Sequence, residues 1–362
     1  GFITVFPGGA TRPTASNLNY TAGQSPTPNQ VTVALGATGQ VSFFASGGPV
    51  NLIADIAGYT TAARLTSPQL AQNRWDQDLA KPATITVGLG PGAVAFDGTT
   101  VWVANFIGDS VTRVDPSTST TVGSPITVGD KPSGLAFDGA SIWVTNQGND
   151  NVTRINATTG AIVGSPITVG DAPNGIAFDG TNMWVTNTGS NNVTVIDAET
   201  GAVIGTIPVG TTPSEVVFDG TNMWVTNSGS NTVTRIDAAT GTVVGAPTAT
   251  GTLPQGLAFD GTAIWVANTS SNNVSRIDAA TGTIIGAPVT VGSSPTDVAF
   301  DGTYIWVVNR GTDNLTRIDP ASGAVVGSTI PVADDPFAIA FDGTNVWTAN
   351  YLANKVTKIR AS

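Results

Sequence analysis

The chain has 362 residues, of which 14 are Lys or Arg and 25 are Asp or Glu, so its formal net charge is −11. An acidic chain is a poor partner for nucleic acid, whose phosphates bind clustered Lys and Arg. Because it contains no His and no Cys, the sequence excludes imidazole and thiolate metal sites, and catalysis by a His base or a Cys nucleophile. It has no run of about 18 apolar residues, so no transmembrane helix is expected.

Residues 1–60 alternate apolar and polar residues between Gly-containing turns, which predicts a small β domain. Segments 12–19 and 52–59 resemble a β-sandwich module common in secreted actinobacterial surface proteins, of which a further upstream half is absent here. About 60 residues make a marginal domain with an open apolar face. We expect this face to pack on the rest of the chain, to be covered by another subunit, or to continue into upstream chain. The expected strands are 2–6, 16–20, 30–35, 39–44 and 50–59.

Residues 61–82 form the expected linker, with one possible short helix over 68–79. Trp75 is the only Trp outside the repeat described next. An anchor that packs the linker onto the following domain is favoured over a ligand contact.

Residues 83–362 are dominated by a repeat in which Phe-Asp-Gly is followed, six residues after the Phe, by Trp. The seven copies are spaced by 41, 41, 40, 41, 41 and 41 residues. Such a period in strand-rich sequence predicts a β-propeller, with four antiparallel strands in each blade. The Phe positions are Phe96, Phe137, Phe178, Phe218, Phe259, Phe300 and Phe341.

The two ends of the repeat region predict ring closure. The last copy ends after its third strand, at 355–360, and lacks a fourth. The unpaired segment 83–88 has the fourth-strand pattern of 125–129. We therefore expect the N-terminal segment to complete the C-terminal blade, which hides two sheet edges and gives an all-β, seven-bladed propeller.

The Trp-Val-Thr-Asn sequences at 143–146, 184–187 and 224–227 resemble the YVTN-family propeller repeat, with Trp in place of Tyr. The repeat is also similar to the virginiamycin B lyase propeller and to NHL-type repeats. The YVTN resemblance implies an extracellular or cell-surface protein that binds or scaffolds. The lyase resemblance implies a catalytic His and a bound Mg²⁺, but this chain has no His, so that activity is not transferred.

Residues shared by the copies are expected to build the blade. The Trp is interpreted as core between blades, and the Asp of Phe-Asp-Gly and the Asn three residues after each Trp as turn residues. A basic residue recurs in the third strand, with Asp two places later in most copies, and the pair predicts a solvated charge ladder. These basic residues are Arg113, Arg154, Arg235, Arg276, Arg317 and Lys358.

Function is expected where copies differ. In loops after the second strands we single out Phe106, Ile107, Arg310, Tyr351 and Leu352; in the loops between blades we single out Phe337, Glu215 and Asp297. Ring closure brings blades seven and one together, so the apolar members are predicted to form one patch flanked by Arg310 and Asp335. Exposed apolar patches tend to mark interfaces. A partner-binding patch and a docking site for the N-terminal domain are equally favoured.

Glu215 and Asp297 replace Gly or Ala of the other copies. Two carboxylates can act as acid and base or bind a cation, but no Lys, His or Tyr supports them nearby in sequence, so catalysis is the minor interpretation. No Asp-x-Asp-x-Asp-Gly loop is present, and no metal or cofactor is expected.

The sequence thus favours a secreted or cell-surface, non-catalytic propeller that binds a protein or a surface polymer. One alternative is a structural subunit of an extracellular filament or layer, self-assembling through an N-terminal domain that a neighbour completes. The other is a lyase or hydrolase at the channel mouth that uses Glu215 and Asp297.

Overall fold

The computed structural model describes residues 2–7, 18–19, 41–46 and 82–361. The chain divides into two units, Gly1–Thr66 and Ser67–Ser362, and each is described by itself. Among the described residues, no helix is long and apolar enough to cross a membrane.

In the first unit, three antiparallel strands form one sheet in the order β2-β1-β3. They are β1 (Phe2–Pro7), β2 (Leu18–Asn19) and β3 (Val41–Ser46). The other strands expected in this domain, at 30–35 and 50–59, and the helix expected in the linker lie outside the described residues.

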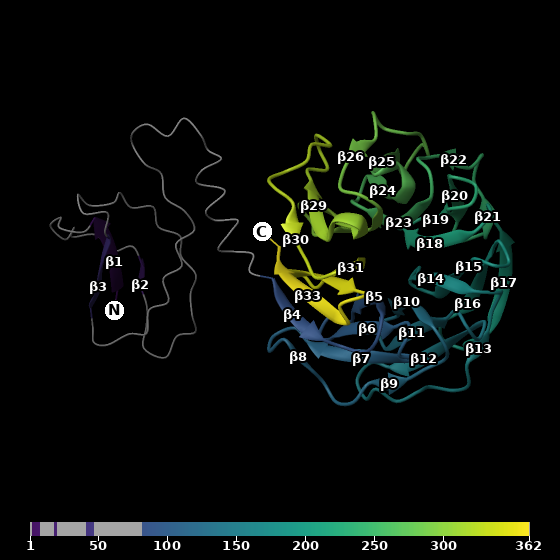
Figure 1. Ribbon diagram of the computed structural model, residues 1–362, viewed down its shortest axis with the longest axis horizontal. Helices are drawn as coiled ribbons and strands as arrows, with labels where there is room; N and C mark the ends of the chain where they lie inside the picture. The colour runs from purple at the N-terminus through teal and green to yellow at the C-terminus, as the bar shows by residue number, and fades with distance from the viewer. Residues whose placement is uncertain (1, 8–17, 20–40, 47–81, 362) are drawn as a thin grey trace. The chain divides into compact units, whose positions relative to one another are not determined.

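The second unit is a ring of seven antiparallel sheets, which confirms the predicted all-β, seven-bladed propeller (Figure 1). The innermost strands are β5 (Pro91–Phe96), β10 (Pro132–Phe137), β14 (Pro173–Phe178), β18 (Pro213–Phe218), β23 (Pro254–Phe259), β27 (Pro295–Phe300) and β31 (Pro336–Phe341). The second strands are β6 (Val101–Asn105), β11 (Ser141–Asn146), β15 (Asn182–Asn187), β19 (Asn222–Asn227), β24 (Ala263–Asn268), β28 (Ile305–Asn309) and β32 (Asn345–Asn350).

The third strands carry the recurrent basic residue in every blade but the third, where Val195 takes its place. They are β7 (Ser110–Asp115), β12 (Asn151–Asn156), β16 (Asn192–Asp197), β20 (Thr232–Asp237), β25 (Asn273–Asp278), β29 (Asn314–Ile318) and β33 (Lys355–Arg360). Two 3₁₀ turns, η1 (Thr269–Ser271) and η2 (Arg310–Thr312), follow the second strands of blades five and six.

The outer edge explains why one copy is 40 residues long. In blade three the fourth strand is continuous, β17 (Val203–Pro208). In blade four, Gly245 has φ of 69° and is followed by Ala246 and Pro247, which splits the edge into β21 (Thr242–Val243) and β22 (Thr248–Ala249). The residue that blade four has in addition to blade three thus interrupts the edge strand, and an interrupted edge is less prone to pair with another chain. The other short edge strands are β8 (Thr120–Thr121), β9 (Ile126–Thr127), β13 (Ile167–Thr168), β26 (Val289–Thr290) and β30 (Ile330–Pro331).

The predicted ring closure is confirmed. β4 (Ala83–Thr86) pairs antiparallel with β33 and supplies the missing fourth strand of blade seven (Figure 1). Ile85 is 8% exposed and packs in the cluster that contains Trp347 and Val356. The apolar side chain of β4 thus anchors the closing strand to the core of the last blade.

A hydrogen bond repeated seven times joins each blade to the next. The residue before each third strand has a left-handed backbone, as at Asn354 with φ of 55°, and Asn and Asp tolerate this conformation best after Gly. The side-chain oxygen of Asn354 accepts the N–H of Gly90 at 2.8 Å, closing the ring from blade seven to blade one. The other six acceptors are Asp109, Asp150, Asn191, Asn231, Asn272 and Asp313.

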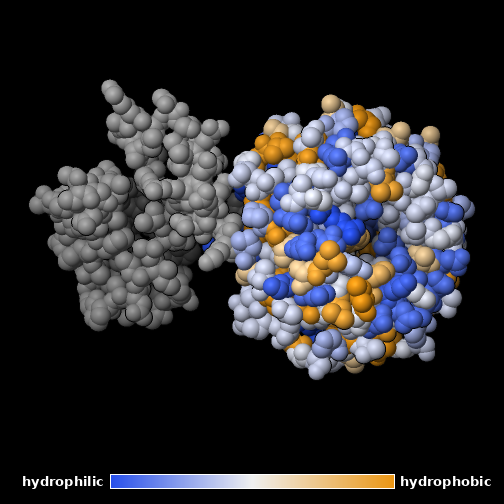
Figure 2. All heavy atoms as spheres, viewed as in Figure 1, coloured by the Kyte–Doolittle hydropathy of each residue, from blue (hydrophilic) through white to orange (hydrophobic). Residues whose placement is uncertain are grey.

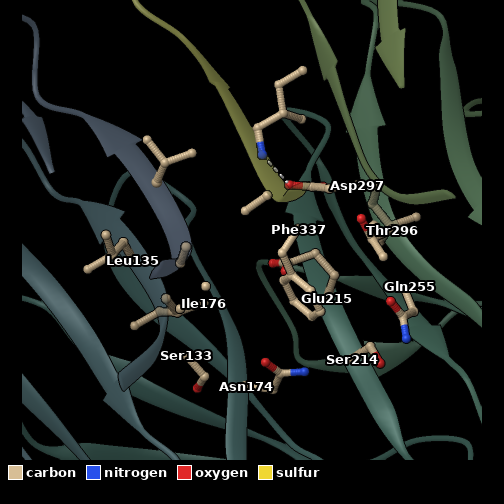
Figure 3. A pocket seen from close by; sticks show the side chains of 18 of the residues that line it. Ser133, Leu135, Asn174, Ile176, Ser214, Glu215, Gln255, Thr296, Asp297 and Phe337 are labelled. Carbon is tan, nitrogen blue, oxygen red and sulfur yellow. Dashed lines mark hydrogen bonds between the residues drawn. The ribbon is translucent and has the colours of Figure 1, made fainter. Parts of the chain in front are cut away.

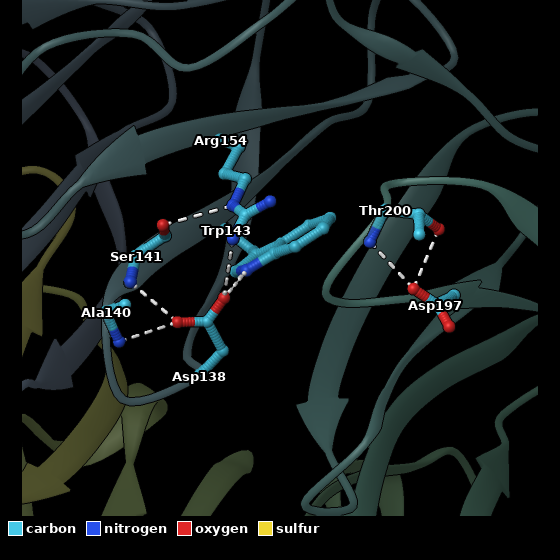
Figure 4. Close-up of polar contacts among 7 residues, drawn as sticks. All are labelled: Asp138, Ala140, Ser141, Trp143, Arg154, Asp197 and Thr200. Carbon is cyan, nitrogen blue, oxygen red and sulfur yellow. Dashed lines mark hydrogen bonds and ion pairs between the residues drawn. The ribbon is translucent and has the colours of Figure 1, made fainter.

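The repeated Asp and Trp form one unit. In blade two, Oδ1 of Asp138 accepts the N–H groups of Ala140 and Ser141, and Oδ2 accepts the indole N–H of Trp143 at 2.7 Å (Figure 4). The Asp therefore fixes the hairpin and satisfies the one polar atom of a fully buried ring. The same indole bond occurs in the other six blades.

The predicted charge ladder is largely wrong. The third-strand cation instead lies over the Trp ring of its own blade, as Arg154 does with its guanidinium 5.0 Å from the centroid of Trp143. A ring face attracts a cation, and Nη2 of Arg154 also lies 3.6 Å from Oδ2 of Asp138, the carboxylate that binds the Trp143 indole.

The strand-end carboxylates of the ladder accept hydrogen bonds from the following turn; Asp237, for example, binds the N–H and the hydroxyl of Thr240. Figure 4 shows the equivalent bonds of Asp197 to Thr200 in blade three. For the strand-end Asp, a turn N–H is the nearer partner. Hydrogen bonds from the N–H of Ala321 and from Ser322 lower the pKa of Asp319, and the charge of Arg276 adds a smaller contribution, which is the one trace of the ladder.

Candidate functional site

The innermost strands of all seven blades line a central cavity of about 230 Å³ (Figure 3). Its lining changes along the strands. The second residue of each innermost strand forms the first level of the lining, which varies between blades and is mostly polar. The third and fourth residues form the second and third levels. The second level is Gly or Ala except in two blades. The third level is Val, Leu or Ile throughout. The first level consists of Gly92, Ser133, Asn174, Ser214, Gln255, Thr296 and Phe337.

The two exceptions at the second level are Glu215 in β18 and Asp297 in β27. A Cβ atom on Gly175 would come within 2.7 Å of Oε1 of Glu215, and one on Gly256 would come within 2.5 Å of Oδ1 of Asp297. Glycine in the preceding blade therefore makes the space that each carboxylate occupies. Both acids were predicted for loops between blades; that was wrong, because the strands begin two residues earlier, at Pro213 and Pro295.

The hydrogen bonds of the two carboxylates differ. Asp297 uses both oxygens, accepting the N–H of Val298 at 2.8 Å and that of Ile339 in the next blade at 2.9 Å. Glu215 accepts only the N–H of Val216, through Oε1 at 3.2 Å. Asp297 thus has a structural role that joins blades six and seven, whereas Oε2 of Glu215 is open to the cavity.

Burial changes the protonation of both acids. It raises the pKa of Glu215 from 4.5 to about 8, with a further contribution from the charge of Asp297. It raises the pKa of Asp297 from 3.8 to about 7, despite two backbone N–H groups that act in the opposite direction. The cavity therefore holds carboxyl groups that change charge near neutral pH.

This titration predicts that the protein loses stability as the pH rises from about 4 to about 8. In that window the unfolded chain releases protons that the folded cavity retains, so unfolding becomes more favourable. Urea unfolding of the wild type and of the double variant Glu215→Gln, Asp297→Asn measures the effect, and the double variant should lose most of the decline. The carboxylates with lowered pKa, such as Asp115 at about 2, act only below this window. A free energy of unfolding that is flat between about pH 5 and 8 in the wild type contradicts the assignment.

A second cavity, of about 280 Å³, opens above the first and shares Gly92, Ser133, Asn174 and Phe337 with it. Phe106 and Tyr351 also line it, with ring centroids 6.2 Å apart and planes at 54°. We call the two connected cavities the funnel: the upper one is its mouth and the lower one its throat.

Arg310 lies at the rim of the mouth. Its guanidinium is 5.3 Å from the centroid of Phe337 and binds both carboxylate oxygens of Asp335, with Nη2 to Oδ2 at 3.1 Å. The ion pair raises the pKa of Arg310 further above its usual range. Arg310 thus holds Asp335 and Phe337 in fixed positions while its side chain stays 42% exposed.

The structure brings together four of the six residues of the predicted patch: Phe106, Arg310, Phe337 and Tyr351. Phe337 comes from strand β31 and not from a loop, contrary to the prediction. Ile107 and Leu352 are 56% and 63% exposed and do not line the mouth. On the face shown in Figure 2, hydrophobic residues lie in small groups among hydrophilic ones.

Sequence reasoning missed the polar collar of the throat, to which Asn174, Gln255 and Thr296 contribute (Figure 3). The signal was present one residue before Glu215 and Asp297, where the copies also differ. The hydroxyl of Thr296 is the notable case, because the residue is 4% exposed and Oγ1 has no hydrogen-bond partner.

The fold and its funnel define the class of protein as a seven-bladed β-propeller with a lined axial cavity. Residues 76–359 match the virginiamycin B lyase family, and the chain belongs to that family. A comparison with curated proteins gave no match.

Several solved structures share the fold. Kuenenia stuttgartiensis hydrazine synthase is 24% identical, with a TM-score of 0.66 over 84% of this chain and 99% of that one. Virginiamycin B lyase from Staphylococcus aureus is 20% identical, with a TM-score of 0.67 over 78% of this chain and 100% of that one. A catalytically inactive His-to-Ala variant of that lyase, with quinupristin, gives a TM-score of 0.66 at 20% identity over 78% and 100%. At these identities the likeness concerns the fold.

The residues of the funnel do not fit the Mg²⁺ that the lyase resemblance implies. Among the described residues there is no group of three or more His, Cys, Asp or Glu that could hold a metal ion. Both oxygens of Asp297 already accept backbone N–H groups, and hard divalent cations favour several free oxygen ligands.

Proposed function

We propose that the propeller is a non-catalytic binding module whose ligand, a protein or a surface polymer, enters the mouth of the funnel. The observation that supports this most is the composition of the mouth. Phe106, Arg310, Phe337 and Tyr351 each break the repeat, yet they line one cavity. Aromatic residues and Arg are the side chains that most often dominate binding energy.

The test is an array of defined peptides and glycans, probed with the wild type and with Tyr351→Ala. Ligands of the wild type should bind the variant roughly tenfold or more weakly, because an anchor of the mouth is removed. Ile204→Ala, in the exposed outer strand of blade three, is the control and should bind like the wild type. Array ligands that bind Tyr351→Ala and the wild type equally well rule out the mouth as the site.

The finer assignments belong to the same proposal. The YVTN-like repeats at 143–146, 184–187 and 224–227 and the sandwich-like segments 12–19 and 52–59 support a secreted or cell-surface location. Self-assembly through the N-terminal domain, as in a filament or layer, is the alternative role, and electron microscopy of native material tests it.

A second candidate is an enzyme that acts in the throat. The observation that favours it is the raised pKa of Glu215 and Asp297, which is typical of catalytic acids. Against the lyase reaction itself, a His-to-Ala variant of the Staphylococcus aureus relative is catalytically inactive, and this chain has no His. Glycan, peptide or lactone turnover that disappears in Glu215→Gln supports an enzyme; turnover unchanged in Glu215→Gln removes that residue from consideration.

A further inference from the structure

The throat holds negative groups without a counter-charge. Among the residues that the structure describes, Glu215 and Asp297 are the only charged ones that line it, and no Lys or Arg does. The nearest cation along the funnel, Arg310 at the mouth, already binds both oxygens of Asp335. A group that enters the throat therefore meets two carboxyls that no protein cation neutralises.

A third oxygen points to a missing hydrogen-bond donor. Oγ1 of Thr296 is buried and has no partner, although buried hydroxyls almost always have one. In Figure 3 the hydroxyl oxygen of Thr296 lies on the side of the residue that faces Asp297. The Thr296 hydroxyl and the two acids thus line one cavity, in which Oγ1 of Thr296 has no partner and Glu215 is bonded through Oε1 alone.

The shape of the throat restricts what can reach these oxygens. At the level of the acids the other blades present only Gly or Ala, and below it the lining is Val, Leu or Ile. Phe337 stands above, at the boundary with the mouth. A slender apolar stem that carries a terminal cation fits this lining, because the stem contacts the aromatic ring while the cation reaches the acceptors.

We propose that the throat binds a primary alkylammonium group, such as a lysine side chain of a protein ligand or the end of a free amine. Its N–H donors match Oε2 of Glu215 and Oγ1 of Thr296. Asp297, whose oxygens already accept the N–H groups of Val298 and Ile339, contributes its negative charge. This inference deepens the proposed function, since the ammonium group belongs to the ligand that the mouth receives.

The protonation of the throat supports this ligand. Burial holds the pKa of Glu215 at about 8 and that of Asp297 at about 7, so both sites are partly protonated in the empty throat. An ammonium group favours the ionised forms and lowers both pKa values. Affinity should therefore rise from about pH 6 to about pH 8.5, below the pKa of a lysine-type amine at about 10.4. The remaining charged groups near the mouth, Arg310 and Asp335, form an ion pair with each other.

Two backbone amides report directly on the site. The N–H of Val216 donates to Glu215 and the N–H of Ile339 donates to Asp297. In nuclear magnetic resonance titrations of the full chain at about pH 8.5, n-pentylammonium should shift both amide signals saturably. Its neutral counterpart 1-pentanol should bind at least roughly tenfold more weakly, because a hydrogen bond to a charged group is the stronger one. Nα-acetyl-lysine N-methylamide, compared with n-pentylammonium, distinguishes a peptide source of the amine from a free one.

Matched variants complete the test. Glu215→Gln keeps the shape of the side chain and should weaken n-pentylammonium binding roughly tenfold. Thr296→Val should weaken it with no loss of folding, because the hydroxyl has no internal partner. Glu199→Gln removes a carboxylate from an exposed turn and should bind like the wild type.

Equal binding of n-pentylammonium and 1-pentanol overturns the inference, as does unchanged affinity in Glu215→Gln. Shifts of the Val216 and Ile339 signals by MgCl₂ or CaCl₂ but not by n-pentylammonium overturn it in favour of a metal site. These outcomes leave the proposed function standing if array ligands remain sensitive to Tyr351→Ala, so the two failures are distinguishable.

Discussion

Replacing Trp265 with Ala should lower the free energy of unfolding by roughly 3–5 kcal/mol, the range found when a large buried aromatic is removed from a core. The ring is fully buried and packs with Val298 and Ile305 of the next blade. Its indole N–H donates to Asp260 at 2.7 Å, and the guanidinium of Arg276 lies 5.2 Å from its centroid. The substitution thus removes contacts inside one blade and between two blades, and urea unfolding measures the sum.

Two companion variants separate these contributions. Trp265→Phe keeps a buried ring but removes the donor to Asp260, so a smaller loss of roughly 1–3 kcal/mol is expected. Ile204→Ala, at a side chain 58% exposed, should stay within about 0.5 kcal/mol of the wild type. If Trp265→Ala costs no more than Ile204→Ala, the repeated Trp is not what holds neighbouring blades together.

Ile85→Asp should open the ring at its seam and cost about 3 kcal/mol or more. The side chain is 8% exposed and lies against Trp347 and Val356, so the substitution buries a carboxylate without a partner. β4 is an edge strand whose backbone pairs with β33, from Lys355 opposite Thr86 to Lys358 opposite Ala83. Detachment of β4 therefore exposes the edge of β33. Hydrogen exchange at Val356 and urea unfolding measure the result.

Thr84→Asp provides the matched control. It places the same charge on the same strand, but Thr84 is exposed, so its stability should remain close to that of the wild type. If Ile85→Asp and Thr84→Asp behave alike, with Val356 equally protected in both, closure of the ring does not depend on β4.

Much of the fold could be predicted because the same pattern of strands and turns recurs in seven copies. The blade count and the closing segment follow from the period and from the missing last strand, and both are confirmed. The partners of Asp and Arg were not predictable in the same way. Asp138 is five residues from Trp143, and only the hairpin geometry shows that its second oxygen reaches the indole N–H.

The candidate site was predictable in part, for a related reason. Positions that break the repeat could be identified, so Phe106, Phe337 and Tyr351 were found without a structure. The sequence did not predict how deeply each of these side chains lies in the cavity, because that depends on where each strand begins. Ile107 and Leu352 therefore proved to lie outside the cavity, while Thr296 was overlooked because Thr is common throughout this chain.

Shared residues thus build the ring, and the residues that differ line its axis. The residues that build the ring are separate from those that line the axis. A chain can therefore belong to the virginiamycin B lyase family and have no His. The scaffold is retained, and the proposed binding chemistry resides in an aromatic mouth above two carboxyls whose pKa values lie near neutrality.

The most direct test of this account is a hydrogen-exchange footprint of the tightest ligand selected from the peptide and glycan array. The account predicts slowed exchange at the backbone amides of Phe106, Phe337 and Tyr351, with no change along the outer strand β17. Protection confined to β17 or to the other edge strands, with the funnel unaffected, would contradict it.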